Sequence, residues 1–149
     1  MASTWLTAGA STFDLTGVQL EVGSVATDFE HRSFAQELAL CHRYFFKWVS
    51  SQAYSNFNIG YAASSTSVET VYQLPQVMRA SPSMSTSGTF RIVGYPNQAS
   101  STLSSLEIAR SHSRSPYIRA TCSGMTSGQI GEFGDSGSND ATFSFNAEL

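Results

Sequence analysis

Charged side chains are scarce in this chain of 149 residues: Asp, Glu, Lys and Arg make up 13% of it, and Lys47 is the only lysine. The net charge is −3 at pH 7, and the arginines are dispersed along the sequence. Binding to nucleic acid requires clustered Lys and Arg that neutralise phosphates. The composition therefore argues against a nucleic-acid partner.

Cysteines and long apolar runs are also scarce. Cys41 and Cys122 allow one disulfide at most, and the apolar neighbours of Cys41 predict a buried free thiol. No apolar run reaches the roughly 18 residues of a membrane-spanning helix, and residues 1–5 lack the basic and apolar regions of a secretory signal. We therefore expect a protein that is made in the cytoplasm and does not insert into membranes.

Ser, Thr and aromatic residues are abundant, and they favour β-structure because they suit pleated surfaces and turns better than helices. Short apolar segments recur, separated by Gly, Pro, Ser and Asn, which predicts a mainly β, antiparallel β-sandwich-like domain. The expected strands are Phe57–Ala63, Val68–Leu74, Ser83–Thr86, Thr89–Val93, Leu103–Ala109, Tyr117–Cys122, Gln129–Phe133 and Ala141–Ala147.

One short helix is expected near the N-terminus of this domain. Ser33 and Gln36 have the spacing of a capping box, and a stripe of apolar residues at helical spacing follows: Phe34, Leu38, Cys41 and Phe45. After the helix, the side chains of Tyr44 to Val49 alternate between two faces, and both faces are largely apolar. This pattern predicts a buried central strand with Trp48 in the core.

The chain is expected to have two parts. Residues 1–32 contain two short strands, the second from Phe13 to Val22, and a polar connector, whereas residues 33–149 form the β-sandwich domain. Because two strands alone are not stable, the first part must pair with the rest of the chain or with a neighbouring subunit.

Two turns are predicted from their chemistry. Ser87-Gly88 predicts a tight hairpin between the strands that flank it. The segment from Asp135 to Asp140 is rich in Asp, Asn and Gly, and it lacks the carboxylate spacing of a calcium loop, so a β-turn is the better interpretation.

The histidines do not indicate a zinc site, because none of them has the spacing of zinc ligands: His31, His42 and His112. We expect no metal and no cofactor.

Catalysis is not indicated. Hydrolysis of a glycan needs two carboxylates roughly 5–10 Å apart, and the sequence does not pair any of the candidates, which are Glu69, Glu107, Glu132 and Asp135. No G-x-S-x-G nucleophile motif is present. The expected protein is not an enzyme.

Sugar binding has a simple requirement, an aromatic ring for the C–H face of a pyranose with polar groups beside it. One loop offers this at Tyr95, Asn97 and Gln98. A second segment offers it at Tyr54, Asn56 and Asn58.

Three segments resemble a known family. The first is Leu15 to Phe34, which contains Gln19-Leu20-Glu21-Val22-Gly23, and it continues as Glu37 to Phe45 with Cys41 and Arg43-Tyr44-Phe45. The others are Leu74–Pro82 and Phe145–Leu149. These closely resemble the C-terminal regions of tail fibre proteins of tailed bacteriophages. In those proteins the Gln-Leu-Glu-Val-Gly stretch often closes a preceding jelly-roll domain. Four residues of these segments are expected to have structural roles, in packing and in ion pairs: Arg43, Tyr44, Arg79 and Glu37.

The resemblance implies a virion protein, the receptor-binding tip of a tail fibre, with bacterial surface polysaccharide or lipopolysaccharide and other tail proteins as partners. Fibres of this kind resemble trimers, and the low charge and aromatic excess fit burial between subunits. Two alternatives stay open. A structural virion protein (decoration, baseplate or trimerisation cap) would bind no ligand, and a polysaccharide depolymerase fragment would place two carboxylates in a groove.

Overall fold

The computed structural model describes residues 15–25, 27–96 and 99–148, and the chain divides into two units, Met1–Ser33 and Phe34–Leu149. The described part of the first unit contains neither helix nor strand. It is a loop in which the Thr27 N–H donates to Glu21 Oε1 at 2.6 Å, and the Glu30 N–H donates to Gln19 Oε1 at 2.8 Å. The strand expected at Phe13–Val22 is therefore wrong over its described part, 15–22, because no strand among the described residues pairs with it. The first strand expected in this part of the chain, Thr4–Thr7, lies outside the described residues.

The second unit begins with helix α1 (Phe34–Cys41), as the sequence predicts, and none of its residues is buried. Its apolar stripe faces solvent, with Phe34 81% exposed. Cys41 is exposed, so the prediction of a buried thiol there is wrong; the buried cysteine is Cys122. The reason is that, within residues 34–96 and 99–148, no other element packs over the stripe. Within the described residues, no helix is long and apolar enough to cross a membrane.

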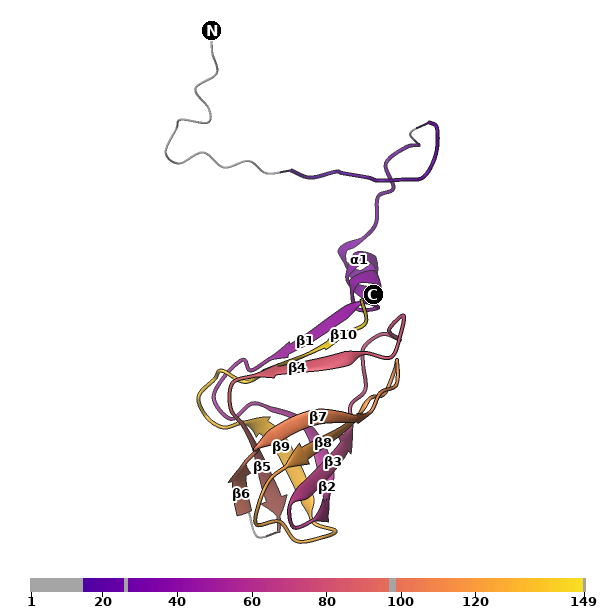
Figure 1. The fold of residues 1–149 in the computed structure, drawn as a ribbon. Helices are drawn as coiled ribbons and strands as arrows, with labels where there is room; N and C mark the ends of the chain where they lie inside the picture. Colours follow the sequence, from indigo (N-terminus) through magenta and orange to yellow (C-terminus); the bar gives the residue numbers. More distant parts are fainter. Residues whose placement is uncertain (1–14, 26, 97–98, 149) are drawn as a thin grey trace, which may run out of the picture. The chain divides into compact units, whose positions relative to one another are not determined.

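In the described residues after the helix, ten strands form two antiparallel sheets, which confirms the mainly β, sandwich-like fold. They are β1 (Phe45–Val49), β2 (Asn56–Ser64), β3 (Ser67–Val71), β4 (Ser83–Ser87), β5 (Phe90–Tyr95), β6 (Ala99–Thr102), β7 (Ser105–Arg110), β8 (Tyr117–Thr121), β9 (Ile130–Asp135) and β10 (Thr142–Asn146). Three strands make a small sheet in the order β1-β10-β4, and seven make a large sheet in the order β6-β5-β9-β2-β3-β8-β7 (Figure 1).

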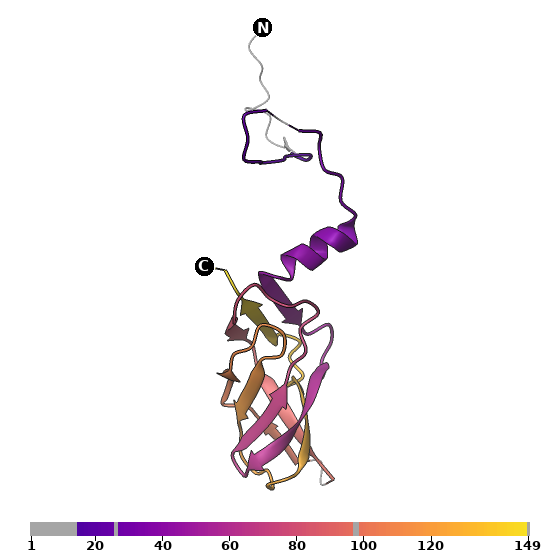
Figure 2. The same cartoon turned by 90° about the vertical axis from the view of Figure 1, so that its right-hand side faces the viewer.

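The large sheet is strongly curled, and its connections explain why. Strands β6 and β7 lie at its opposite edges, yet Leu103 and Ser104 alone connect them. Three Cα–Cα steps span at most about 11 Å, so the two edges must come together. The Leu103 N–H donates to the Phe90 carbonyl on one side at 2.9 Å, and the Ser104 N–H donates to the Thr121 carbonyl on the other at 2.9 Å. Figure 2 shows this curl from the side.

Two apolar clusters form the core. One lies inside the curl of the large sheet and includes Ile92, Val68 and Phe133. The other includes Phe143 and Phe145 of β10, together with residues of both sheets. The side chains of three partly buried residues pack against both clusters and so join them: Phe57, Leu103 and Leu106.

The small sheet corrects the expectation for Tyr44 to Val49. Strand β1 is an edge strand with one exposed face, and Phe45 and Val49 are 43% and 55% exposed. The buried central strand is β10, which carries alternating phenylalanines. Trp48 does pack inward, with its ring stacked on Phe143 at 5.4 Å between centroids.

The hairpin expected at Ser87-Gly88 is also wrong. Strand β4 pairs with β10, whereas β5 pairs with β6 and β9, so the chain changes sheets at this turn. Gly88 has a φ of +78°, and a Cβ there would lie 2.3 Å from the Asp140 carbonyl oxygen. Glycine is required because the β4–β5 turn packs directly on the backbone before β10.

Candidate functional site

The outer face of the large sheet carries most of the candidate residues. Side chains alternate along each strand, so Ile92, Phe133 and Val68 point into the core while their neighbours point outward. One row of outward residues runs across the strands as successive register partners, namely Tyr95 (β5), Ile130 (β9), Tyr61 (β2), Glu69 (β3) and Arg119 (β8). Polar and aromatic groups therefore meet on one surface.

A hollow opens at the β5 end of this row. Its volume is about 540 Å³, and it is lined by Tyr95, Pro96, Thr126, Ser127, Gly128, Gln129 and Ile130. None of these residues is charged. Tyr95 and Ile130 remain 39% and 56% exposed. We call this the Tyr95 hollow.

The loop that forms one wall of the Tyr95 hollow is fixed to the sheet. The Gly128 N–H donates to the Ala62 carbonyl at 2.7 Å, and the Ala62 N–H donates to the Gln129 carbonyl at 2.7 Å. The Gln129 side chain lies against Gly94, where a Cβ would come within 2.8 Å of it, and its Oε1 accepts the Thr126 N–H at 3.0 Å. The hollow is thus preformed, and it offers a ring, aliphatic surface and hydroxyl groups to a neutral ligand.

The residues predicted from the sequence are distributed as follows. Tyr95 lines the hollow, whereas Asn97 and Gln98 lie outside the described residues. Tyr54 stands at a different end of the sheet, 61% exposed, with a φ of +65°. Its ring lies under the Arg91 guanidinium at 5.1 Å and against Gly137, where a Cβ would be 2.6 Å from the ring.

The two asparagines near Tyr54 are held by structural hydrogen bonds. Asn56 donates to Glu132 Oε2 at 3.0 Å and accepts from Arg91 at 3.3 Å. Asn58 donates to the Val71 carbonyl at 3.0 Å, which extends the β2–β3 pairing, and its oxygen accepts the Ile59 N–H at 2.9 Å. The side-chain amides of Asn56 and Asn58 are therefore already engaged within the fold, and Tyr54 is the exposed aromatic member of this group.

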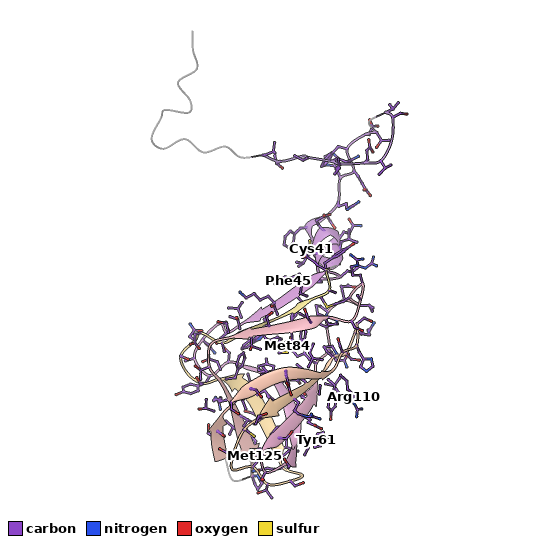
Figure 3. The ribbon with its side chains drawn as sticks, viewed as in Figure 1. Cys41, Phe45, Tyr61, Met84, Arg110 and Met125 are labelled. Carbon is purple, nitrogen blue, oxygen red and sulfur yellow. The ribbon has the colours of Figure 1, made fainter. Side chains whose placement is uncertain are left out.

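A second group of outward side chains, the Glu69 cluster, consists of Tyr61, Glu69, Tyr117 and Arg119. Glu69 is 8% exposed. Its Oε1 accepts from Arg119 Nε at 2.9 Å, and its Oε2 accepts from the hydroxyls of Tyr117 and Tyr61, the latter at 3.1 Å. The Tyr61 and Tyr117 hydroxyl oxygens are 3.2 Å apart. Figure 3 shows Tyr61 and Arg110 on the same side of the sheet.

These bonds set the charges of the Glu69 cluster. The hydrogen bond from Tyr117 lowers the pKa of Glu69, burial opposes this, and Arg119 and Tyr61 lower it further. The same bond to Glu69 raises the pKa of Tyr117. Glu69 is therefore a carboxylate and Tyr117 a neutral phenol across the physiological pH range.

Asp135 is the centre of a structural turn. It is fully buried, and its carboxylate accepts backbone N–H groups from Tyr54, Gly137, Asn139, Asp140 and Ala141 at 2.7–3.4 Å. Burial acts to raise the pKa of Asp135, but these hydrogen bonds outweigh it and the pKa is lowered. Asp135 thus joins the end of β9 to the loop before β10. Among the described residues, no group of three or more His, Cys, Asp or Glu side chains is placed to hold a metal ion.

No family model, curated protein or solved structure matches this chain. Sequence reasoning found Tyr95 but missed the Thr126–Ile130 wall and the Glu69 cluster. The wall meets Tyr95 only because β9 pairs with β5, and the Glu69 cluster is assembled from β2, β3 and β8. The one available signal was the alternation of Tyr61, Glu69, Tyr117 and Arg119 with largely apolar neighbours along their strands.

Proposed function

We propose that this chain is the receptor-binding tip of a bacteriophage tail fibre, a virion protein that binds a bacterial surface glycan without cleaving it. The observation that carries the proposal is the Tyr95 hollow, a preformed, uncharged surface with a half-exposed tyrosine ring. Such a ring suits the C–H face of a pyranose, and Thr126 and Ser127 can bond its hydroxyls. The resemblance of residues 15–45 to tail fibre proteins supports the virion setting.

The carboxylates favour binding over hydrolysis. Three of the four candidates already have structural partners: Glu69 holds Arg119 and two tyrosines, Glu132 holds Asn56, and Asp135 holds five backbone N–H groups. Asp135 is also fully buried. A glycosidase needs two carboxyl groups that reach the scissile bond.

The proposal includes assembly into a homotrimer, with other tail proteins and surface polysaccharide or lipopolysaccharide as partners. The apolar stripe of α1 and the outer face of β1 are exposed in the single chain, and Phe34, Leu38, Phe45 and Val49 together form a surface that a second and third copy can cover. Three identical sites on one tip raise avidity well above the affinity of one site.

The first experiment measures the mass of the full chain in solution and titrates it with host surface polysaccharide. Tyr95→Ala removes the ring of the hollow and should weaken binding by about three- to tenfold, the value of one aromatic contact. Tyr54→Ala, an exposed tyrosine outside the hollow, is the matched control and should bind as the wild type does.

Each outcome has a clear meaning. Binding that is lost in Tyr95→Ala and kept in Tyr54→Ala supports an adhesin with its site at the hollow. The reverse pattern moves the site to the Tyr54 segment. A folded oligomer that binds no polysaccharide of its host contradicts the adhesin and favours the structural cap.

A further inference from the structure

The Glu69 cluster has the properties of a built site. Glu69 is nearly buried, and its two oxygens fix three other side chains, so their positions do not depend on a ligand. Because those bonds are already made, the cluster presents fixed groups outward. Tyr61 is 48% exposed, and the side chain of Arg119 is 47% exposed.

Several charged side chains around the Glu69 cluster have donor or acceptor atoms that make no hydrogen bond within the described residues. Arg119 donates to Glu69 through Nε, and within the described residues no hydrogen bond involves its two terminal nitrogens. Arg110 lies over the Tyr117 ring at 5.5 Å, and no hydrogen bond in the described parts of the chain uses its guanidinium. Glu107 stands opposite Arg119 on β7, exposed, and without a described partner. Donors and an acceptor are thus available side by side.

This combination selects a class of ligand. A sugar hydroxyl donates and accepts at once, so adjacent hydroxyls match a guanidinium and a carboxylate together. The charges of Arg110 and Arg119 balance those of Glu69 and Glu107, so the surface has no net attraction for an acidic sugar.

The cluster adjoins the Tyr95 hollow. Ile130, which lines the hollow, is the register partner of both Tyr95 and Tyr61. Two strand spacings, about 10 Å, therefore separate the Tyr95 and Tyr61 backbones. A ligand in the hollow needs only to extend past Ile130 to reach the Tyr61 ring.

We infer that the Glu69 cluster is a second saccharide subsite, next to the Tyr95 hollow, and that the ligand is a neutral oligosaccharide which occupies both. One unit lies in the hollow, and a further unit stacks on Tyr61 with its hydroxyls on Arg119 and Glu107. This inference rests on the proposed function.

The test titrates the full chain with oligosaccharides of one and of three repeat units, prepared from neutral and from uronate-containing bacterial surface polysaccharides. The wild type should bind a three-unit neutral oligosaccharide at least about tenfold more tightly than its single unit. Tyr61→Ala should weaken binding of the longer form about three- to tenfold and leave the single unit unaffected. Tyr61→Phe keeps the ring and should keep most of the affinity.

Arg119→Gln should weaken the longer form at least about tenfold, and Arg32→Gln, which removes the same charge from the first unit, should change nothing. Because Arg119→Gln also loosens Glu69, the deciding variant is Tyr61→Ala, which changes a half-exposed residue.

The outcomes separate the second subsite from the proposed function. If Tyr61→Ala binds the longer form like the wild type while Tyr95→Ala does not, the second subsite is overturned and the proposed function stands. Tighter binding of the uronate form overturns the neutral class. If no oligosaccharide binds, the proposed function itself fails.

Discussion

At the scale of single residues, the structural role of Asp135 depends directly on its carboxylate. A buried carboxylate that accepts five backbone N–H groups cannot be replaced without leaving donors unsatisfied. We expect Asp135→Asn to lower the free energy of unfolding by at least about 2 kcal/mol, because the amide offers a donor where the loop needs an acceptor. Asp28→Asn, on an exposed residue, is the control and should have no effect beyond about 0.5 kcal/mol.

The same carboxylate links stability to pH. The pKa of Asp135 is lowered in the folded state, so the folded protein binds this proton more weakly than the unfolded chain. The stabilisation is complete above about pH 5 and is lost as the pH falls through the ordinary carboxyl range and below it. Glu69, whose pKa is also lowered, acts in the same direction. Urea unfolding at several pH values should show this acid loss, and a smaller loss in Asp135→Asn; equal slopes would contradict the assignment.

The two cysteines should differ in reactivity. Cys41 is exposed on α1, whereas Cys122 is buried and burial raises the pKa of its thiol. A thiol reagent reacts with the accessible thiolate, so in dilute solution Cys41 should be labelled at once and Cys122 after unfolding. The variants Cys41→Ser and Cys122→Ser each remove one phase of the labelling reaction and so show which cysteine reacts in it. Rapid labelling of Cys122 in the native protein would show that the curled sheet opens.

At the scale of elements, the close packing of β2 against its neighbours depends on Gly60. A Cβ on Gly60 would lie 2.3 Å from the Glu69 carbonyl oxygen and 2.7 Å from the Phe133 ring. Gly60→Ala should therefore destabilise the fold by about 1–3 kcal/mol, measured by chemical unfolding. Gly23→Ala has its nearest contact at 3.6 Å and should be neutral. If Gly60→Ala left the free energy of unfolding unchanged, β2 and β3 would have to be able to move apart.

The elements also show what could be predicted from the sequence. Helix α1 and nearly all the strands after it were found, because apolar period and turn residues are local signals. Strand β6 was missed, and the pairing at Gly88 was assigned to a hairpin, because the partner of a strand is decided by distant residues. The same limit applies to the site: Tyr95 could be found from its own loop, but the Glu69 cluster exists only once β2, β3 and β8 are side by side.

At the scale of the whole molecule, the exposed apolar surface of α1 and β1 is the feature that the single chain does not explain. An isolated helix of this length is marginal in water and needs packing to persist, yet none of the residues of α1 is buried. Phe34, Leu38 and Cys41 are exposed on α1, and Phe45 and Val49 are exposed on β1, the next element of the chain. Burial between identical subunits, as the proposed trimer requires, would stabilise both elements.

The assembly is tested by placing one new charge on each side of α1. Leu38→Glu puts a carboxylate in the apolar stripe and should convert a trimer to monomers, as measured by light scattering across a range of concentrations. Gln36→Glu adds the same charge on the opposite side of the helix and should leave the trimer intact. In the trimer the Cys41 thiol should be protected, so its labelling should slow as concentration rises, and Leu38→Glu should restore fast labelling. A wild-type chain that stays monomeric, with Cys41 equally reactive at every concentration, would contradict the trimer and leave the α1 surface to a different partner.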